Sequence, residues 1–148
     1  MRRATRALVA AVAAASVCAP AAQAAECRGI LYLTIDTGSM SQAEAIAATL
    51  AKHGVKATFF LANEKTVNGD RSLDPAWAPY WKARAAEGHA FGSHTWDHGY
   101  FRGDLPDGKV KYVVAGKPQT LDGPGVCAEL RRSEARFREF TGRGFDPI

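Results

Sequence analysis

Two histidines four positions apart, His94 and His98, are the residues of this sequence best suited to chemistry. The imidazole ring is a common ligand of zinc and of similar divalent ions. If the segment between the two residues turns helically, both rings face the same way. Two histidines of a surface loop would give the same pattern, however, so the pair needs a partner elsewhere in the chain.

Asp36 is the partner that the order of the elements provides. It directly follows residues 30–35, Ile-Leu-Tyr-Leu-Thr-Ile, a run typical of a short buried strand. His94 directly follows residues 90–93, which predict a very short strand. A simpler interpretation of Asp36 is a side chain that only satisfies backbone amides of the loop after the strand.

The elements around these residues alternate in type, so that strands and helices follow one another. The expected strand, helix, strand, helix and strand cover residues 30–35, 41–54, 56–62, 75–87 and 90–93. Ser41 and Glu44 form a capping box at the first helix. Such alternation predicts parallel strands, whose carboxyl ends lie on one side, where ligands bind. Asp36 and His94 should therefore share one rim.

Three further side chains lie near this rim in the sequence. Glu64 and Asp70, in the loop after the second expected strand, could reach the rim, but the sequence shows no partner for them. Trp96 lies between the two histidines and either lines a substrate cleft or packs under the loop.

Beyond His98 the pattern is weaker. Residues 111–115 favour one strand of a surface hairpin, and residues 127–140 favour a helix. The chain stops at residues 145–148, where a fourth strand would begin. We therefore expect a parallel sheet interrupted after about three strands.

The first 24 residues have the pattern of a secretory signal peptide. Arg2, Arg3 and Arg6 precede a charge-free run that ends in Ala22-Gln23-Ala24. A membrane anchor is the alternative, but the run falls short of the ~20 strongly apolar residues that span a bilayer. Without these three arginines, 19 − 3 = 16 Lys and Arg face 15 Asp and Glu, a net charge of +1. We expect an exported, periplasmic or secreted protein with no stable membrane anchor and no nucleic-acid partner.

The expected mature chain, residues 25–148, has the length of one small domain. It contains two cysteines, Cys27 and Cys127. An oxidising compartment favours a disulfide between them, and two unrelated free thiols are the alternative.

Three stretches resemble the polysaccharide deacetylase family, also called the NodB-homology domain or carbohydrate esterase family 4. They are residues 34–38 (Thr-Ile-Asp-Thr-Gly), 56–60 (Lys-Ala-Thr-Phe-Phe) and 88–98 (Gly-His-Ala-Phe-Gly-Ser-His-Thr-Trp-Asp-His). The resemblance runs from about Ile30 to His98. It implies an α/β fold, a distorted (β/α) barrel of which residues 25–148 would be the truncated amino-terminal part. It also implies a metal-dependent hydrolase that removes acetyl groups from chitin, peptidoglycan and related N-acetylated glycans.

The resemblance assigns roles to individual residues. Asp36 matches the catalytic base, and His94 and His98 match the two metal-binding histidines. Thr37 stands where the family usually has a second, metal-binding Asp, and a neutral hydroxyl is a poorer ligand than a carboxylate. The implied cofactor is a divalent metal, with zinc favoured and cobalt, nickel or manganese as alternatives. The arginine and the later histidine that complete the family's site have no counterpart after His98.

Other functions remain open at this point. An inactive or carbohydrate-binding paralogue would fit Thr37 and the early end of the chain. A deacylase of the same fold acting on a lipid-linked sugar is a second alternative. A metallopeptidase is disfavoured, because the sequence has no His-Glu-x-x-His motif.

Overall fold

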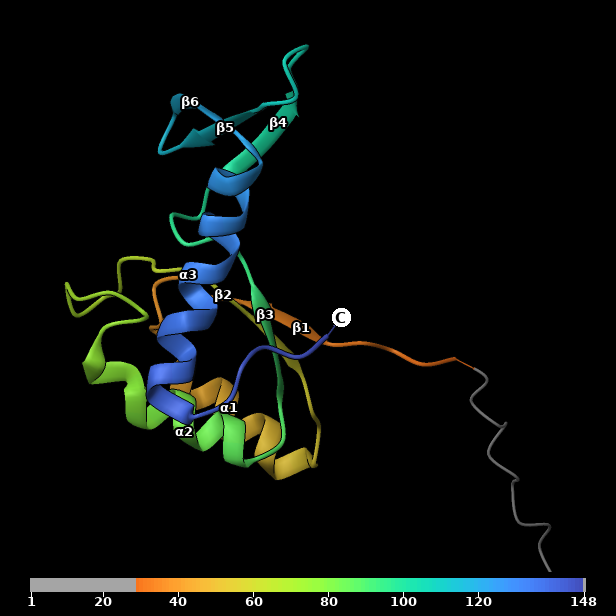
Figure 1. Ribbon diagram of the computed structural model, residues 1–148. Helices are drawn as coiled ribbons and strands as arrows, with labels where there is room; N and C mark the ends of the chain where they lie inside the picture. The colour runs from red at the N-terminus through yellow and green to blue at the C-terminus, as the bar shows by residue number, and fades with distance from the viewer. Residues whose placement is uncertain (1–28, 148) are drawn as a thin grey trace, which may run out of the picture. The chain divides into compact units, whose positions relative to one another are not determined.

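The computed structural model describes residues 29–147, and residues from Leu31 onward belong to one compact unit. The expected signal segment, residues 1–24, and Cys27 lie outside the described residues. Two three-stranded sheets are present in the described part (Figure 1). The first is parallel, in the order β1-β2-β3, with strands Thr34–Asp36, Thr58–Leu61 and Ala90–Ser93. The prediction of an α/β fold with parallel strands is confirmed.

The register of the parallel sheet separates two faces. Ile35, Phe59 and Phe91 lie in one row across the three strands, and Phe59 and Phe91 are buried. Asp36 lies in the next row, beside Phe60 and Gly92. Because side chains alternate between the faces of a strand, the first row packs under helices and the second row points the other way.

Helices α1 (Ala43–His53), α2 (Ala78–Ala86) and α3 (Gly123–Thr141) supply most of the rest of the core, and the short 3₁₀ helix η1 (Pro75–Trp77) leads into α2. Aromatic rings join the helices to the sheet. The Phe91 ring centroid lies 5.8 Å from that of Phe59 and 4.3 Å from that of Phe137 on α3. Each such side chain contributes about 1.5–3 kcal/mol when it leaves water. This packing fixes the strands whose ends carry Asp36 and His94.

The start of α1 differs from the expected capping box. Gln42 is the N-cap residue and makes no side-chain cap, while the Ser41 hydroxyl bonds the Ser39 hydroxyl at 3.0 Å. Ser41 therefore stabilises the preceding loop instead of the helix. At the other end Gly54 stops the helix as expected, in a left-handed conformation with φ +62°.

The segment after His98 is richer in structure than the single expected hairpin. It forms an antiparallel sheet of β4 (Tyr100–Asp104), β5 (Val110–Val114) and β6 (Lys117–Leu121). Every residue of β4 is exposed, so the strand lacks the alternation of apolar and polar residues by which strands are recognised.

Helix α3 begins four residues earlier than expected. The Asp122 side chain caps it by accepting a hydrogen bond from Gly125 N at 2.8 Å, so the Gly-Pro-Gly run that suggests a loop is helical. Its buried face carries Glu129 and Ser133, whereas Leu130, an apolar residue of the same helix, is exposed. Within residues 29–147, none of the helices has the length and apolar character needed to cross a bilayer.

The segment after α3 lies along β3. Asp146 N donates to Phe91 O at 3.0 Å, and Phe91 N donates to the Asp146 carboxylate at the same distance. Residues 143–147 have no strand assignment. They nevertheless lie beside β3, and residues 145–148 are where the sequence pattern would begin a fourth strand.

Candidate active site

Asp36 and His94 lie together at the carboxyl ends of β1 and β3. His94 is two residues past Gly92, so strand alternation places it on the same face as Asp36. His94 N donates to Leu61 O at 3.0 Å and continues the sheet pairing. The His94 Nε2 and Asp36 Oδ2 atoms are 3.8 Å apart, and the Asp36 side chain is 57% exposed. The two side chains share one rim, as the order of the elements predicts.

His98 joins this pair through its ring. The centroids of the His94 and His98 rings are 4.6 Å apart, with planes inclined by 39°. The chain between them is not helical, since Thr95 and His98 have positive φ angles of 62° and 51°. Such values are uncommon for residues with a side chain and indicate that surrounding contacts hold the loop.

A second carboxylate contacts His98. Glu64 Oε1 lies 2.9 Å from His98 Nδ1, and the Glu64 side chain is only 17% exposed. Sequence reasoning gave Glu64 no partner, because its loop follows β2 and its approach to His98 depends on the path of two loops. The site therefore consists of two carboxylate–histidine pairs joined by the contact between the rings.

Buried side chains of α3 and β5 hold the loop that carries His98 through hydrogen bonds. Glu129 Oε2 accepts hydrogen bonds from Asp97 N at 3.2 Å and from the Tyr112 hydroxyl at 3.0 Å. The same hydroxyl accepts from Gly99 N at 3.1 Å, and Glu129 O accepts from Trp96 N at 3.1 Å. The loop is thus fixed on both sides of His98.

Tyr112 is packed tightly against this loop. Burial is the main cause that raises the pKa of its phenol above the ordinary value, so the hydroxyl stays protonated and can donate to Glu129. A Cβ atom at Gly99 would collide with the Tyr112 ring. Position 99 therefore requires glycine for a close approach.

Thr37 does not reach toward the histidines. Its hydroxyl is buried, accepts a hydrogen bond from Ala62 N at 2.9 Å and donates to Ala62 O at 3.3 Å. Both hydrogen-bonding functions of the hydroxyl are therefore used between the ends of β1 and β2. The residue at the position of the usual second carboxylate serves here as a link between strands.

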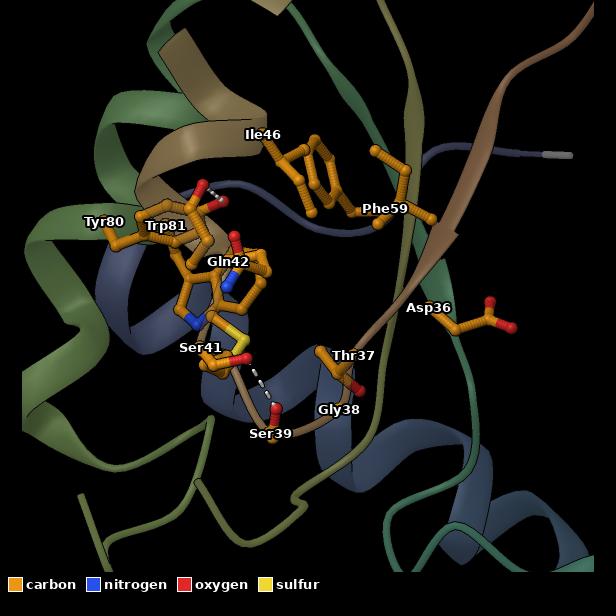
Figure 2. A pocket seen from close by; sticks show the side chains of 13 residues that line it. Asp36, Thr37, Gly38, Ser39, Ser41, Gln42, Ile46, Phe59, Tyr80 and Trp81 are labelled. Atoms are coloured by element: carbon orange, nitrogen blue, oxygen red, sulfur yellow. Dashed lines mark hydrogen bonds between the residues drawn. The ribbon is translucent and has the colours of Figure 1, made fainter. Parts of the chain in front are cut away.

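A pocket of ≈ 210 Å³ lies under the loop that follows β1. It is lined by residues 35–43 and by Ile46, Phe59, Tyr80 and Trp81. Figure 2 shows the Asp36 carboxylate pointing away from the other labelled side chains of this pocket. The pocket therefore lies on the helix-covered side of β1, whereas the carboxylate faces His94.

Other polar candidates serve the fold. The Asp70 carboxylate accepts from the Thr66 hydroxyl and from Trp77 Nε1, which fixes its own loop. His89 Nδ1 accepts from Ala57 N at 3.1 Å, and burial lowers the pKa of His89 below its usual value. Trp96 packs on the core with the Arg132 guanidinium 4.5 Å above its ring, which favours packing over a substrate cleft.

The donor chemistry at the rim fits a divalent ion, since two imidazoles and a carboxylate are ligands that zinc and its neighbours accept. Between residues 29 and 147, however, no group of three or more His, Cys, Asp or Glu side chains is close enough to hold an ion as it stands. The predicted ligands are thus neighbours but not a finished cluster. Cys127 is exposed and forms no disulfide within the described residues.

Comparisons with known proteins identify related sequences. Residues 23–147 match the sequence profile named polysaccharide deacetylase. A chitin deacetylase of Pestalotiopsis sp is 30% identical over 111 residues, which are 75% of this chain and 30% of that protein. The peptidoglycan-N-acetylglucosamine deacetylase PgdA of Listeria monocytogenes is 34% identical over 84 residues, 56% of this chain and 16% of that protein.

A solved structure shares the fold. The chitin deacetylase of the fungal pathogen Colletotrichum lindemuthianum superimposes with a TM-score of 0.52 at 23% identity. The match covers 75% of this chain and 40% of that one. The present chain thus spans less than half the length of each of these three proteins.

Proposed function

The chain belongs to the polysaccharide deacetylase family, and we propose that it carries the metal-binding and base residues of a hydrolase that removes acetyl groups from N-acetylated glycans such as chitin or peptidoglycan. The approach of Asp36 to His94, at 3.8 Å on one rim, carries the proposal. This contact brings together two residues that are 58 positions apart in the sequence. The family resemblance matches one of them to the catalytic base and the other to a metal-binding histidine.

The proposal extends to the architecture and to the compartment. The three parallel strands would be part of a distorted (β/α) barrel, with Asp36 and His94 on the inward face and the helices outside. Residues 1–24 would direct export to the periplasm or the medium, and residues 25–148 would form the amino-terminal part of the deacetylase domain. A disulfide between Cys27 and Cys127 would be compatible with the exposure of Cys127.

His94 and His98 would hold a divalent ion, with zinc favoured on the chemistry of the donors. When bound, such an ion polarises an acetyl carbonyl and makes water more acidic. Asp36 would accept the proton of the attacking water, a contribution of about 10²–10⁴-fold for a general base. The Asp36 side chain is 57% exposed, so water can reach its carboxylate.

The test compares acetate release from chitin oligomers by the zinc-loaded wild-type protein and by Asp36→Asn. The variant should keep its zinc and lose most of the activity, because the amide is a very weak base. Asp107→Asn, an exposed change between β4 and β5, is the matched control and should behave as wild type. Wild-type activity that survives complete removal of metal would contradict the proposal.

A binding function without turnover is the second candidate, and Thr37 favours it. Its hydroxyl is committed to Ala62, so position 37 supplies no charge to the ion. If this alternative holds, calorimetry should detect the binding of chitin oligomers, and an acetate assay should detect no acetate released from them.

A further inference from the structure

Glu64 supplies a negative charge beside the proposed metal ligands, where position 37 supplies none. We propose that Glu64 is a positioning residue that holds His98 with its Nε2 atom free to bind a divalent cation. The inference rests on the proposed function, since it concerns the same site. It adds a residue for which the sequence motifs give no role.

The contact between Glu64 and His98 determines which ring nitrogen carries the hydrogen. The 2.9 Å separation of Glu64 Oε1 and His98 Nδ1 is a hydrogen-bond length. An ionised carboxylate only accepts hydrogen bonds, so Nδ1 carries the hydrogen and donates. In a neutral ring the lone pair then lies on Nε2. Metal-binding histidines typically make this kind of bond with their other nitrogen, and it fixes the ring orientation.

The backbone of Glu64 is mounted rigidly. Glu64 N donates to the Ser72 hydroxyl at 3.0 Å, and Glu64 O accepts from Ser72 N at 2.8 Å. Ser72 is fully buried, and its hydroxyl donates to Ala62 O at 2.6 Å. The side chain of Glu64 therefore starts from a fixed point, which is what a residue that orients another must have.

The carboxylate of Glu64 is incompletely satisfied by the protein. Its Oε2 atom is buried and has no hydrogen-bond partner among residues 29–147. A buried, half-paired carboxylate costs stability, so folding alone gives no reason for it. A divalent cation on His98 would offset this cost, because Asp36 and Glu64 together would balance its two charges.

The short segment that follows β2 and carries Glu64 also binds the hydroxyl of Thr37. Ala62, whose backbone binds the Thr37 hydroxyl, is two residues before Glu64, and Asn63 N donates to Trp96 O at 2.8 Å. The end of β2 is thus tied both to the loop of Asp36 and to the loop of His98. This segment brings a carboxylate to His98 from the β2 side instead of the β1 side.

The first measurement is the tautomer of His98 in the metal-free protein, read from two-bond nitrogen–proton couplings in ¹⁵N NMR. His98→Ala identifies its signals among those of the four histidines. The hydrogen should be on Nδ1 in the wild type. It should move toward Nε2 in Glu64→Ala, which removes the acceptor, and less so in Glu64→Gln, which keeps a neutral one.

The second measurement is zinc affinity by isothermal titration calorimetry. Glu64→Ala should bind zinc about 10–100-fold more weakly, the usual cost of losing such a partner. Glu64→Gln should lie between the alanine variant and wild type. Glu139→Ala, which removes a 63% exposed carboxylate on α3, should bind as wild type does.

Three results would overturn the positioning role. They are a wild-type His98 with its hydrogen on Nε2, a Glu64→Ala variant with wild-type zinc affinity, and a Glu64→Gln variant that binds no zinc while its His98 keeps the Nδ1 hydrogen. The last result would make Glu64 a direct ligand. A protein with the expected tautomer and zinc affinities that releases no acetate would refute the proposed function and leave this inference standing.

Discussion

His94 and His98 are four positions apart, yet different parts of the molecule hold them. His94 continues β3, and its position follows from sheet pairing and from the aromatic packing of Phe91. His98 lies in a loop with positive φ angles, held by the side chains of Glu64, Glu129 and Tyr112. A regular backbone thus places one proposed ligand, and long-range side-chain contacts place the other.

We expect the largest loss of stability from a mutation that removes the aromatic packing under the parallel sheet. Phe91→Ala should lower the free energy of unfolding by about 3–5 kcal/mol, because it leaves a cavity among three aromatic rings. Urea unfolding measures this loss. Both histidines should be displaced, since the loop of His98 follows β3. Leu130→Ala, an exposed apolar change on α3, is the control and should cost far less. Equal losses would mean that Phe91 does not anchor the sheet.

A smaller effect should reach the loop alone. Gly99→Ala forces a methyl group into the Tyr112 ring, and overpacking of this kind typically costs about 1–3 kcal/mol. The NMR signals of His98 should shift strongly and those of His94 weakly. Gly123→Ala, where an added Cβ would have no contact within 4 Å, should leave both unchanged. If the His94 signals moved as much as those of His98, the two supports would not be independent.

Tyr112→Phe should have a milder effect on the same loop. It removes the hydroxyl, but Gly99 N keeps a bond to the Thr95 hydroxyl and Glu129 keeps its bond from Asp97 N. The loss should therefore be about 0.5–1.5 kcal/mol, that of an ordinary hydrogen bond, measured by urea unfolding. Tyr100→Phe, at an exposed tyrosine of β4, is the control. A loss of 3 kcal/mol or more would show that the remaining bonds of the loop depend on the hydroxyl.

The smallest effect concerns His89, just before the other end of β3. Burial lowers its pKa in the folded state, so the unfolded chain binds the proton more readily. The free energy of unfolding should therefore fall as the pH drops below the usual histidine pKa of about 6.5 toward the lower folded value, and stay constant above it with respect to this group. His89→Gln should reduce this slope in urea unfolding at a series of pH values. An unchanged slope would count against a buried neutral His89.

The difference between the supports of His94 and His98 also explains which features of the site the sequence predicts and which it does not. Strand alternation and the order of elements place Asp36 and His94 on one rim without any knowledge of loops. The partnership of Glu64 with His98 depends on two irregular loops, and no periodic pattern encodes it. From the sequence alone, a glutamate on a helix such as Glu129 would be placed in solvent. It is a buried hydrogen-bond acceptor because α3 packs against the loop that carries His98. The family motifs locate His98 but not what orients it.

Thr37 also bears on how such a site can change over generations. Its hydroxyl both donates to and accepts from the backbone of Ala62. An aspartate at position 37 could still accept from Ala62 N, but its ionised oxygen would face Ala62 O without a hydrogen and in a buried place. Moving the carboxylate between positions 37 and 64 would take two mutations. A protein with a carboxylate at both positions would have an unpaired buried charge at position 37. A protein with a carboxylate at neither position would lack the second negative charge that balances the divalent ion. If Glu64 has the role proposed above, the effect of a carboxylate at position 37 on zinc binding depends on the residue at position 64, and the two changes should not be additive.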